Sequence, residues 1–131
     1  MRSLIVEDDF AARKLLQVHL SDYGDTSIAV NGKEAVQAVE DSLNCGKPYD
    51  LICLDIMMPE MDGLEALKHI RKLEQDRAIT GLDGAKVIVV TSSGQHRDVF
   101  AAFKNGCEAY MVKPVKKDKL VEEMRKLGLI E

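Results

Sequence analysis

Residues 51–63 read Leu-Ile-Cys-Leu-Asp-Ile-Met-Met-Pro-Glu-Met-Asp-Gly, and this stretch decides the fold. It begins with a run that is apolar at every position, which is typical of a parallel strand covered on both faces. Asp55 follows the run directly. Asp62, with Glu65 three residues later, forms a capping-box pattern, and apolar residues then recur at helical spacing over residues 64–70. The stretch therefore predicts a strand, a loop and a helix, with a carboxylate at the carboxyl end of the strand.

The same alternation extends over the whole chain of 131 residues, a length typical of one domain. The polar stretches 41–49 and 74–86 are expected to be surface loops. Strand and helix alternate five times, which predicts an α/β sheet of parallel strands joined by right-handed crossovers. The other expected strands are 4–6, 28–30, 87–90 and 110–112, and the other expected helices lie within 10–23, 35–43, 99–103 and 120–127.

Composition excludes several classes of protein. The chain is 46% hydrophobic and 31% charged, as an ordinary globular protein is. Its apolar runs are too short to span a membrane, and its N-terminus lacks the pattern of a signal peptide. The 18 basic residues against 22 acidic ones give a net charge of −4, which argues against nucleic acid as a direct partner. The three cysteines are scattered along the chain, which suits a reducing compartment, so we expect a cytoplasmic protein. From the short apolar runs and the net charge, we expect neither a membrane nor a nucleic acid as a partner.

Polar residues follow four of the expected strands. In an open α/β sheet, ligands bind beyond the carboxyl ends of the strands, so these side chains are expected to face one crevice. Any one of these polar residues could simply belong to a surface loop, where such residues are common. Together, however, they supply acids, a hydroxyl and an ammonium group. They are Glu7, Asp8 and Asp9 after the first strand, Asp55 after the third, Thr91 and Ser92 after the fourth, and Lys113 and Pro114 after the fifth.

The chemistry of this crevice follows from its charges. Asp8 and Asp55 repel each other when held close, and a hard divalent cation with oxygen ligands, Mg²⁺ or Mn²⁺, relieves that repulsion. Asp55 then stays ionised and can attack phosphorus as a carboxylate nucleophile. The phosphoryl oxygens would be shared among the metal, Lys113 and the hydroxyl of Thr91. No general base is needed, because a carboxylate is already deprotonated.

The residues quoted above resemble the receiver domain of two-component response regulators, and the resemblance covers essentially the whole chain. It implies a single-domain flavodoxin-like (βα)5 sandwich with strand order 2-1-3-4-5. It makes Asp55 the phosphoacceptor, Thr91 the switch hydroxyl and Lys113 the phosphate-binding lysine. It also implies a cis peptide bond between Lys113 and Pro114, and an aromatic switch residue at Tyr110.

The resemblance also implies a metal-ligand set. Met57 would give its backbone carbonyl to Mg²⁺ beside Asp55. Receivers commonly carry an arginine five residues after the direct ligand, and Arg13 stands five after Asp8. Asp8 is therefore assigned as the direct ligand and Glu7 as a ligand through water, which leaves Asp9 at the rim. The alternative, Asp8 paired with Asp9, stays open.

The implied function is a phosphorylation-activated switch. A histidine kinase or histidine phosphotransfer protein would donate the phosphoryl group. The face formed by the fourth helix, fifth strand and fifth helix would then change and signal to an effector protein. We expect a stand-alone receiver domain over residues 1–131, monomeric and without an output domain, of the chemotaxis or phosphorelay-shuttle type. It would be no enzyme beyond its own phosphorylation and dephosphorylation.

Two other functions on similar folds fit the sequence less well. An aspartyl-phosphate hydrolase needs a second acid two residues after the nucleophile, where this chain has Met57. A flavin carrier needs a hydroxyl- and glycine-rich phosphate loop after the first strand, where three acids would repel phosphate. Phe10, directly after those acids, has two open readings, since it could dock a partner or pack in the core.

Overall fold

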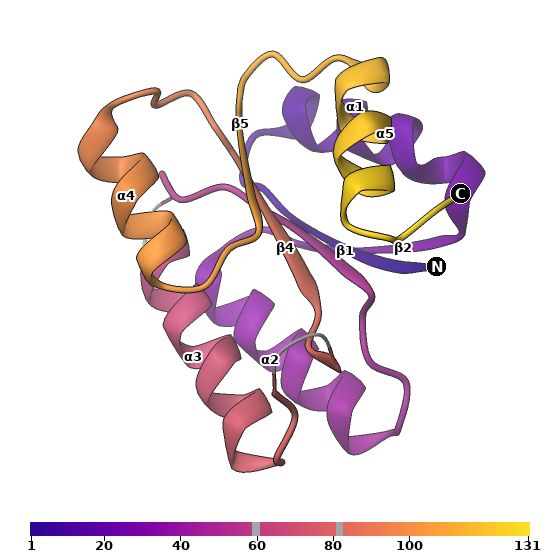
Figure 1. Cartoon of the computed structure of the whole chain (residues 1–131), viewed down its shortest axis with the longest axis vertical. Helices are drawn as coiled ribbons and strands as arrows, with labels where there is room; N and C mark the ends of the chain where they lie inside the picture. The colour runs from indigo at the N-terminus through magenta and orange to yellow at the C-terminus, as the bar shows by residue number, and fades with distance from the viewer. Residues whose placement is uncertain (59–60, 81–82) are drawn as a thin grey trace.

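The structure is a computed structural model that describes residues 1–58, 61–80 and 83–131. Pro59 and Glu60, which belong to the motif quoted above, lie outside the described residues. Parallel strands form one sheet in the order β2-β1-β3-β4-β5, which confirms the predicted fold class (Figure 1). The strands are β1 (Arg2–Val6), β2 (Asp25–Ala29), β3 (Leu51–Leu54), β4 (Lys86–Thr91) and β5 (Ala109–Val112).

Helices cover both faces of the sheet, and α1 and α5 share one face (Figure 1). The apolar cluster on the other face includes side chains of α2, α3 and α4. The first helix ends earlier than expected, at Leu20, and a 3-10 turn, η1 (Ser21–Tyr23), follows it. The helices are α1 (Phe10–Leu20), α2 (Gly32–Asn44), α3 (Gly63–Asp76), α4 (His96–Lys104) and α5 (Lys117–Lys126).

The central strands are apolar at every position because both of their faces are covered. In β3, Ile52 and Leu54 pack into the cluster under α2 and α3, while Leu51 and Cys53 pack into the cluster under α1 and α5. All of these side chains are fully buried. This double burial explains why the strands read as continuous apolar runs rather than as alternating patterns.

The prediction of surface loops at 41–49 and 74–86 is wrong at the start of each stretch. Helix α2 continues to Asn44 and α3 continues to Asp76. Glu74 is only 6% exposed, because its carboxylate accepts hydrogen bonds from Arg71 (2.7 Å) and from the backbone of Ala85 (2.8 Å). A buried charge with such partners cannot be recognised from local composition, since the partners come from elsewhere in the fold.

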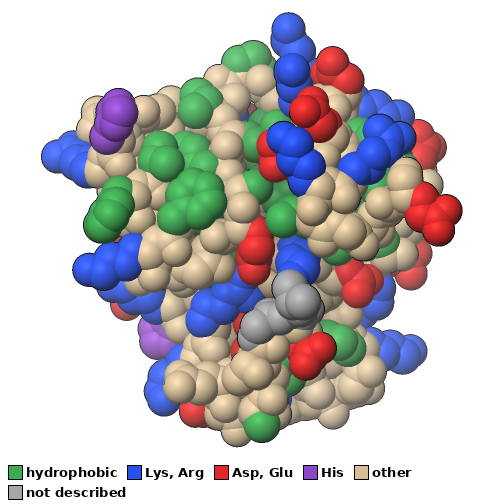
Figure 2. All heavy atoms as spheres, viewed as in Figure 1, with side chains coloured by type: hydrophobic (Ala, Val, Ile, Leu, Met, Phe, Trp, Pro, Cys, Tyr) green, Lys and Arg blue, Asp and Glu red, His purple; other side chains and the backbone are tan. Residues whose placement is uncertain are grey.

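Helix α4 is packed more lightly than its neighbours. Ala102 is its one buried residue, whereas Phe100 is 70% exposed and Phe103 47% exposed. Apolar side chains gather over this helix in Figure 2, and Val112 on neighbouring β5 is 48% exposed. Within the described part of the chain, no helix is both long enough and apolar enough to cross a membrane.

Candidate phosphoryl and metal site

The parallel register brings the ends of β1 and β3 together. Val6 pairs with Leu54, and the backbone N–H of Asp55 donates to the carbonyl of Val6 at 3.0 Å. The residues that follow each strand are therefore neighbours. Glu7, Asp8 and Asp55 each present a carboxylate oxygen, and these oxygens all lie within 4.8 Å of one another. We call these three residues the acidic cluster.

Lys113 connects the end of β5 to this cluster. Its Nζ lies 3.0 Å from Oδ2 of Asp55 and also contacts Oε1 of Glu7. The backbone N–H of Lys113 donates to the carbonyl of Thr91 at 2.8 Å, and the peptide bond to Pro114 is cis. One ammonium group thus lies between two carboxylates that would otherwise repel each other.

Burial dominates the electrostatics of Glu7. The residue is 1% exposed, and desolvation raises the pKa of its carboxyl to about 7, although the hydrogen bond from Lys113 acts in the opposite direction. Burial alone would lower the pKa of Lys113, but its hydrogen bonds to Glu7 and Asp55 outweigh burial and raise it. Lys113 therefore remains charged while Glu7 can change its protonation near neutral pH.

The carboxylate of Asp55 is held from both sides. Its Oδ1 accepts a hydrogen bond from the backbone N–H of Met57 at 2.9 Å, and its Oδ2 faces Lys113. Asp55 is 4% exposed, whereas the Met57 side chain two residues later is 59% exposed. A thioether that points to solvent supplies no acid or base, which fits a site without a second catalytic carboxyl at this position.

Asp9 has a different task from the two acids before it. Its Oδ2 accepts a hydrogen bond from the backbone N–H of Ala12 at 2.8 Å, so Asp9 is the N-cap of α1. It is not a member of the acidic cluster. The geometry thus favours Glu7 with Asp8 over Asp8 with Asp9. The cap could have been read from the sequence, since Asp directly before a helix is a common N-terminal signal.

Phe10 lies on the surface rather than in the core. It is 69% exposed, and its ring lies 5.4 Å from the guanidinium carbon of Arg13, which in turn donates to the carbonyl of Glu7 at 3.2 Å. Of the two readings of Phe10, core packing is therefore wrong. An apolar groove of about 400 Å³ runs close by, lined by α1 residues such as Leu15 and by Lys113, Pro114 and Val115 after β5.

Thr91 ends β4 with a hydroxyl that has no hydrogen-bond partner among the described residues. The residue is completely buried. A buried hydroxyl without a partner costs free energy, so a position of this kind calls for an explanation. A phosphoryl oxygen on Asp55 is an acceptor of the type that this hydroxyl lacks.

Tyr110 is tied to the loop before α4. Its hydroxyl donates to the backbone carbonyl of Ser93 at 2.6 Å, and its ring packs against the cluster under α2, α3 and α4. Desolvation raises the pKa of the Tyr110 hydroxyl, so it remains a donor at neutral pH. Ser93 in turn donates through Oγ to the carboxylate of Asp98 in the first turn of α4. Sequence reasoning did not identify Ser93 or Asp98, because only the fold brings them to Tyr110.

The donor set fits Mg²⁺ or Mn²⁺ rather than a softer metal. Carboxylate oxygens at one edge of a sheet are the ligands that hard cations prefer, and Asp8 is exposed while Glu7 and Asp55 are buried. An exposed acid beside two buried ones leaves room for water and for an incoming oxygen ligand.

Comparison with known proteins places this site in a family. Residues 3–125 match the family described as response regulator receiver domain. The chain is 34% identical over 129 residues to the chemotaxis protein CheY of Thermotoga maritima, and the match covers 97% of each protein.

Solved structures show the same arrangement of elements. The receiver domain of the histidine kinase CKI1 from Arabidopsis thaliana, complexed with Mg²⁺ and BeF3⁻, has a TM-score of 0.83 at 28% identity, over 97% of this chain and 89% of that one. A chain of the CheX–CheY–BeF3–Mg²⁺ complex from Borrelia burgdorferi has a TM-score of 0.81 at 26% identity, over 99% and 90%. The family match spans nearly the whole sequence, and the fold agrees with it, so the chain belongs to the response regulator receiver domain family.

Proposed function

We propose that the chain accepts a phosphoryl group on Asp55 from a histidine kinase or a histidine phosphotransfer protein. The observation that carries this proposal is the position of the Lys113 ammonium, 3.0 Å from Oδ2 of Asp55 and inside the acidic cluster. A lysine there can bind an oxygen of a phosphoryl group that arrives on Asp55. The complex of the related CKI1 receiver domain with Mg²⁺ and BeF3⁻ supports a site of this kind.

In the transfer, a carboxylate oxygen of Asp55 attacks phosphorus. The phosphorus–nitrogen bond of the donor histidine breaks as the oxygen–phosphorus bond forms, and the imidazole leaves. Lys113 binds one phosphoryl oxygen and Thr91 donates its hydroxyl to another. The hydrogen bond from Met57 orients the carboxylate before attack. The chain would thus act as a phosphoacceptor and not as an enzyme that turns over a substrate.

The metal would be held by Asp8 and Asp55, by the backbone carbonyl of Met57, and by Glu7 through water. Mg²⁺ or Mn²⁺, when bound, supplies positive charge that offsets the charge developing on the phosphoryl oxygens. Asp9 remains the alternative partner of Asp8, but its bond to Ala12 favours a capping role.

The signal would leave through Thr91 and Tyr110. Phosphorylation adds charge and acceptor oxygens next to Thr91, whose hydroxyl has no partner among the residues described. Movement of Thr91 toward the phosphoryl group would vacate space behind β4, and Tyr110, which donates to the carbonyl of Ser93 at 2.6 Å, is placed to rotate into that space. The face formed by α4, β5 and α5, which carries the exposed side chains of Phe100, Phe103 and Val112, would then change and signal to an effector protein.

We further infer that this receiver domain acts as a monomer in the cytoplasm, with proteins rather than nucleic acid or membrane as partners. Its net charge of −4 supports the exclusion of nucleic acid.

The test is to incubate the chain with a small phosphodonor and Mg²⁺ and to map the acyl phosphate. Label is expected on Asp55 alone and should be absent from Asp55→Asn. Asp62→Asn is the matched control, because Asp62 is an N-cap carboxylate outside the acidic cluster and its cap survives the change. Label that persists in Asp55→Asn would rule out the assignment.

A further inference from the structure

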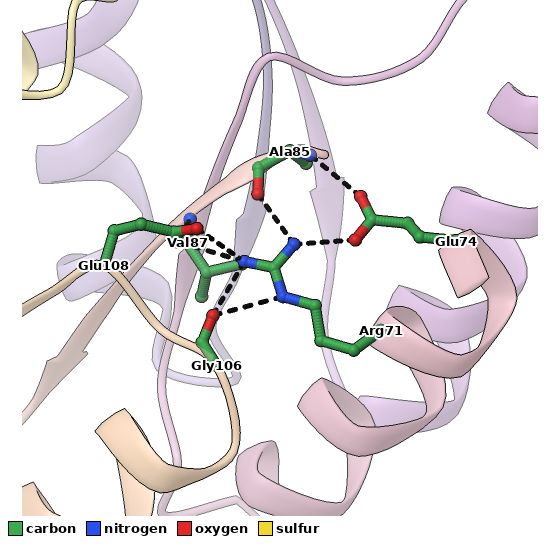
Figure 3. A network of polar contacts seen from close by, with 6 residues as sticks. All are labelled: Arg71, Glu74, Ala85, Val87, Gly106 and Glu108. Atoms are coloured by element: carbon green, nitrogen blue, oxygen red, sulfur yellow. Dashed lines mark hydrogen bonds and ion pairs between the residues drawn. The ribbon is translucent and has the colours of Figure 1, made fainter. Parts of the chain in front are cut away.

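The segment between β5 and α5 carries the lysine of the candidate site. The start of β5 is firmly held, because Arg71 of α3 donates to the carbonyl of Gly106 at 2.7 Å and to Glu108 at 2.9 Å (Figure 3). The site lies at the other end of the strand, so the place of its lysine depends on what holds the residues there. We call these residues the Lys113 segment, which consists of Lys113, Pro114 and Val115.

Backbone hydrogen bonds fasten this segment to a strand and to a helix. The N–H of Lys113 donates to the carbonyl of Thr91 at 2.8 Å, which ties the start of the segment to β4. At its end, the carbonyl of Val115 lies 3.1 Å from Nε2 of His19, in the last turn of α1. A carbonyl oxygen can only accept, so Nε2 carries a proton and donates. His19 therefore ties α1 to the segment that carries the lysine.

The carbonyl of Val115 depends on this donor. Val115 is 5% exposed, and its side chain packs with Leu16 and Leu20 of α1 in the cluster under α1 and α5. Among the residues that the structure describes, no backbone N–H donates to this carbonyl. A buried acceptor without a donor is unfavourable, so the imidazole stabilises the conformation in which the carbonyl of Val115 points to α1.

Apolar packing leaves the rest of the segment room to shift. The groove of about 400 Å³ described above lies between the Lys113 segment and the earlier turns of α1, where Ala11, Ala12 and Leu15 line it. Side chains do not fill this space, so close packing does not fix the segment there. His19 lies one helical turn after Leu15, beyond the residues that line the groove. The bond from His19 thus supplies the link that packing leaves out.

We propose that His19 is a positioning residue for phosphoryl binding, because it holds the Lys113 segment in place through the carbonyl of Val115. This inference rests on the function proposed above and assigns a further residue to the same site. A lysine ammonium ends a flexible four-carbon chain, so its placement depends on how firmly its backbone is held. Nζ of Lys113 lies 3.0 Å from Oδ2 of Asp55, and a small shift of the segment moves it away from an arriving phosphoryl oxygen.

The test compares His19→Leu with His19→Gln. Leucine has no donor, whereas the amide N–H of glutamine can reach the position of Nε2 and donate. In His19→Leu with Mg²⁺ present, the dissociation constant of beryllofluoride, a phosphoryl mimic, should rise about tenfold. The rate at which a small phosphodonor labels Asp55 should fall by a similar factor. His19→Gln should stay within about threefold of the wild-type chain in both measurements.

Controls distinguish positioning from a general loss of structure. Asp22→Asn breaks an exposed ion pair with Lys117, at 3.0 Å, that also joins the end of α1 and η1 to α5. Such pairs contribute little, so both measurements should stay within about twofold of the wild-type chain. Mg²⁺ alone should bind His19→Leu no more than about twofold more weakly, because the proposed metal ligands do not include Lys113. If thermal unfolding shows that His19→Leu does not fold, His19→Met takes its place.

The outcomes separate this inference from the proposed function. A wild-type chain without label on Asp55 overturns the proposed function, and the role of His19 with it. A labelled wild-type chain together with an unimpaired His19→Leu overturns the role of His19 alone. So does a His19→Gln that is as impaired as His19→Leu, or a loss of Mg²⁺ affinity equal to the loss of mimic affinity. Nitrogen spectra of the wild-type ring should show the proton on Nε2, and a bare Nε2 also overturns the role.

Discussion

The hydroxyl of Tyr110 donates a hydrogen bond of 2.6 Å to the backbone carbonyl of Ser93, and this bond joins the edge strand β5 to the loop that leads into α4. The side chain of Ser93 also donates a hydrogen bond to Asp98 in the first turn of α4, so Ser93 is bonded both to β5 and to α4. The position of α4 is therefore linked to the position of the Tyr110 side chain.

Removing that hydroxyl should weaken the link between β5 and α4. Tyr110→Phe loses one hydrogen bond, worth about 1 kcal/mol, that fastens β5 to the loop before α4. We expect the free energy of unfolding to fall by about that amount and the amides of the first turn of α4 to respond less when Mg²⁺ and beryllofluoride, a phosphoryl mimic, bind. Urea unfolding and amide spectra measure the two effects, and Tyr23→Phe, a tyrosine in η1, is the control. An unchanged free energy of unfolding in Tyr110→Phe would contradict the link.

A substitution of Thr91 should separate the effect on stability from the effect on signalling. Its hydroxyl has no partner in the described part of the fold, so Thr91→Val keeps the shape, removes an unsatisfied group and should leave stability equal or higher. The variant should still accept phosphoryl on Asp55. It should not shift the amides of Lys104 and Lys116 when the mimic binds. Thermal unfolding and amide spectra measure the two effects, and wild-type-like shifts at Lys104 and Lys116 would refute the coupling.

Metal binding distinguishes the acids of β1. Asp8→Ala should abolish Mg²⁺ binding, because it removes a member of the acidic cluster. Asp9→Ala should weaken binding only modestly and should cost about 1 kcal/mol of stability through loss of the α1 cap. Asp9→Asn keeps the cap without the charge, so it should restore stability. If Asp9→Asn abolishes binding as Asp8→Ala does, Asp9 is a ligand after all.

Stability without metal should depend on pH through Glu7. Burial raises the pKa of this carboxyl from 4.5 to about 7, so the folded protein keeps a proton that the unfolded chain loses. Stability is therefore lost as the pH rises from about 4.5 to about 7, by on the order of 3 kcal/mol from this group. Urea unfolding in a chelator should show a flatter pH dependence for Glu7→Gln. If the free energy of unfolding of the wild-type chain and that of Glu7→Gln depended equally on pH, this would argue against the raised pKa of Glu7.

The three cysteines should differ sharply in reactivity. Cys45 is exposed, whereas burial raises the pKa of the Cys53 thiol to about 12 and that of Cys107 to about 11. Only a thiolate reacts readily, so a thiol reagent should label Cys45 quickly in the native protein. Cys53 and Cys107 should react only after denaturant is added. Mass mapping of the labelled peptides reads this out, and rapid native labelling of Cys53 would contradict its burial.

The sequence predicted the sheet well because buried parallel strands leave a local signal. Runs such as Leu51 to Leu54 are apolar throughout, and the acids that follow them mark the strand ends. It predicted the length of α3 poorly, because Glu74 looks like a loop residue until Arg71 and Ala85 are placed beside it.

The residues of the site also differ in how far the sequence predicts them. Motif residues that follow strands, such as Asp55 and Lys113, could be named from the sequence alone, and in the fold Nζ of Lys113 lies 3.0 Å from Oδ2 of Asp55. Ser93 and Glu108 could not, because their importance comes from partners that are distant in sequence. Long-range hydrogen bonds leave no periodic trace in a sequence.

The placement of Asp9 as the cap of α1 has a consequence for the charge balance of the site. Helix α1 begins at Phe10, directly after the acids of β1, so its amino-terminal backbone dipoles lie next to negative side chains. The positive end of a helix dipole is worth roughly 0.3–1 kcal/mol to a nearby anion. Together with Lys113, it gives the acids a counter-charge that belongs to the protein itself. The chain can therefore fold with its carboxylates already clustered and take up a divalent ion afterwards.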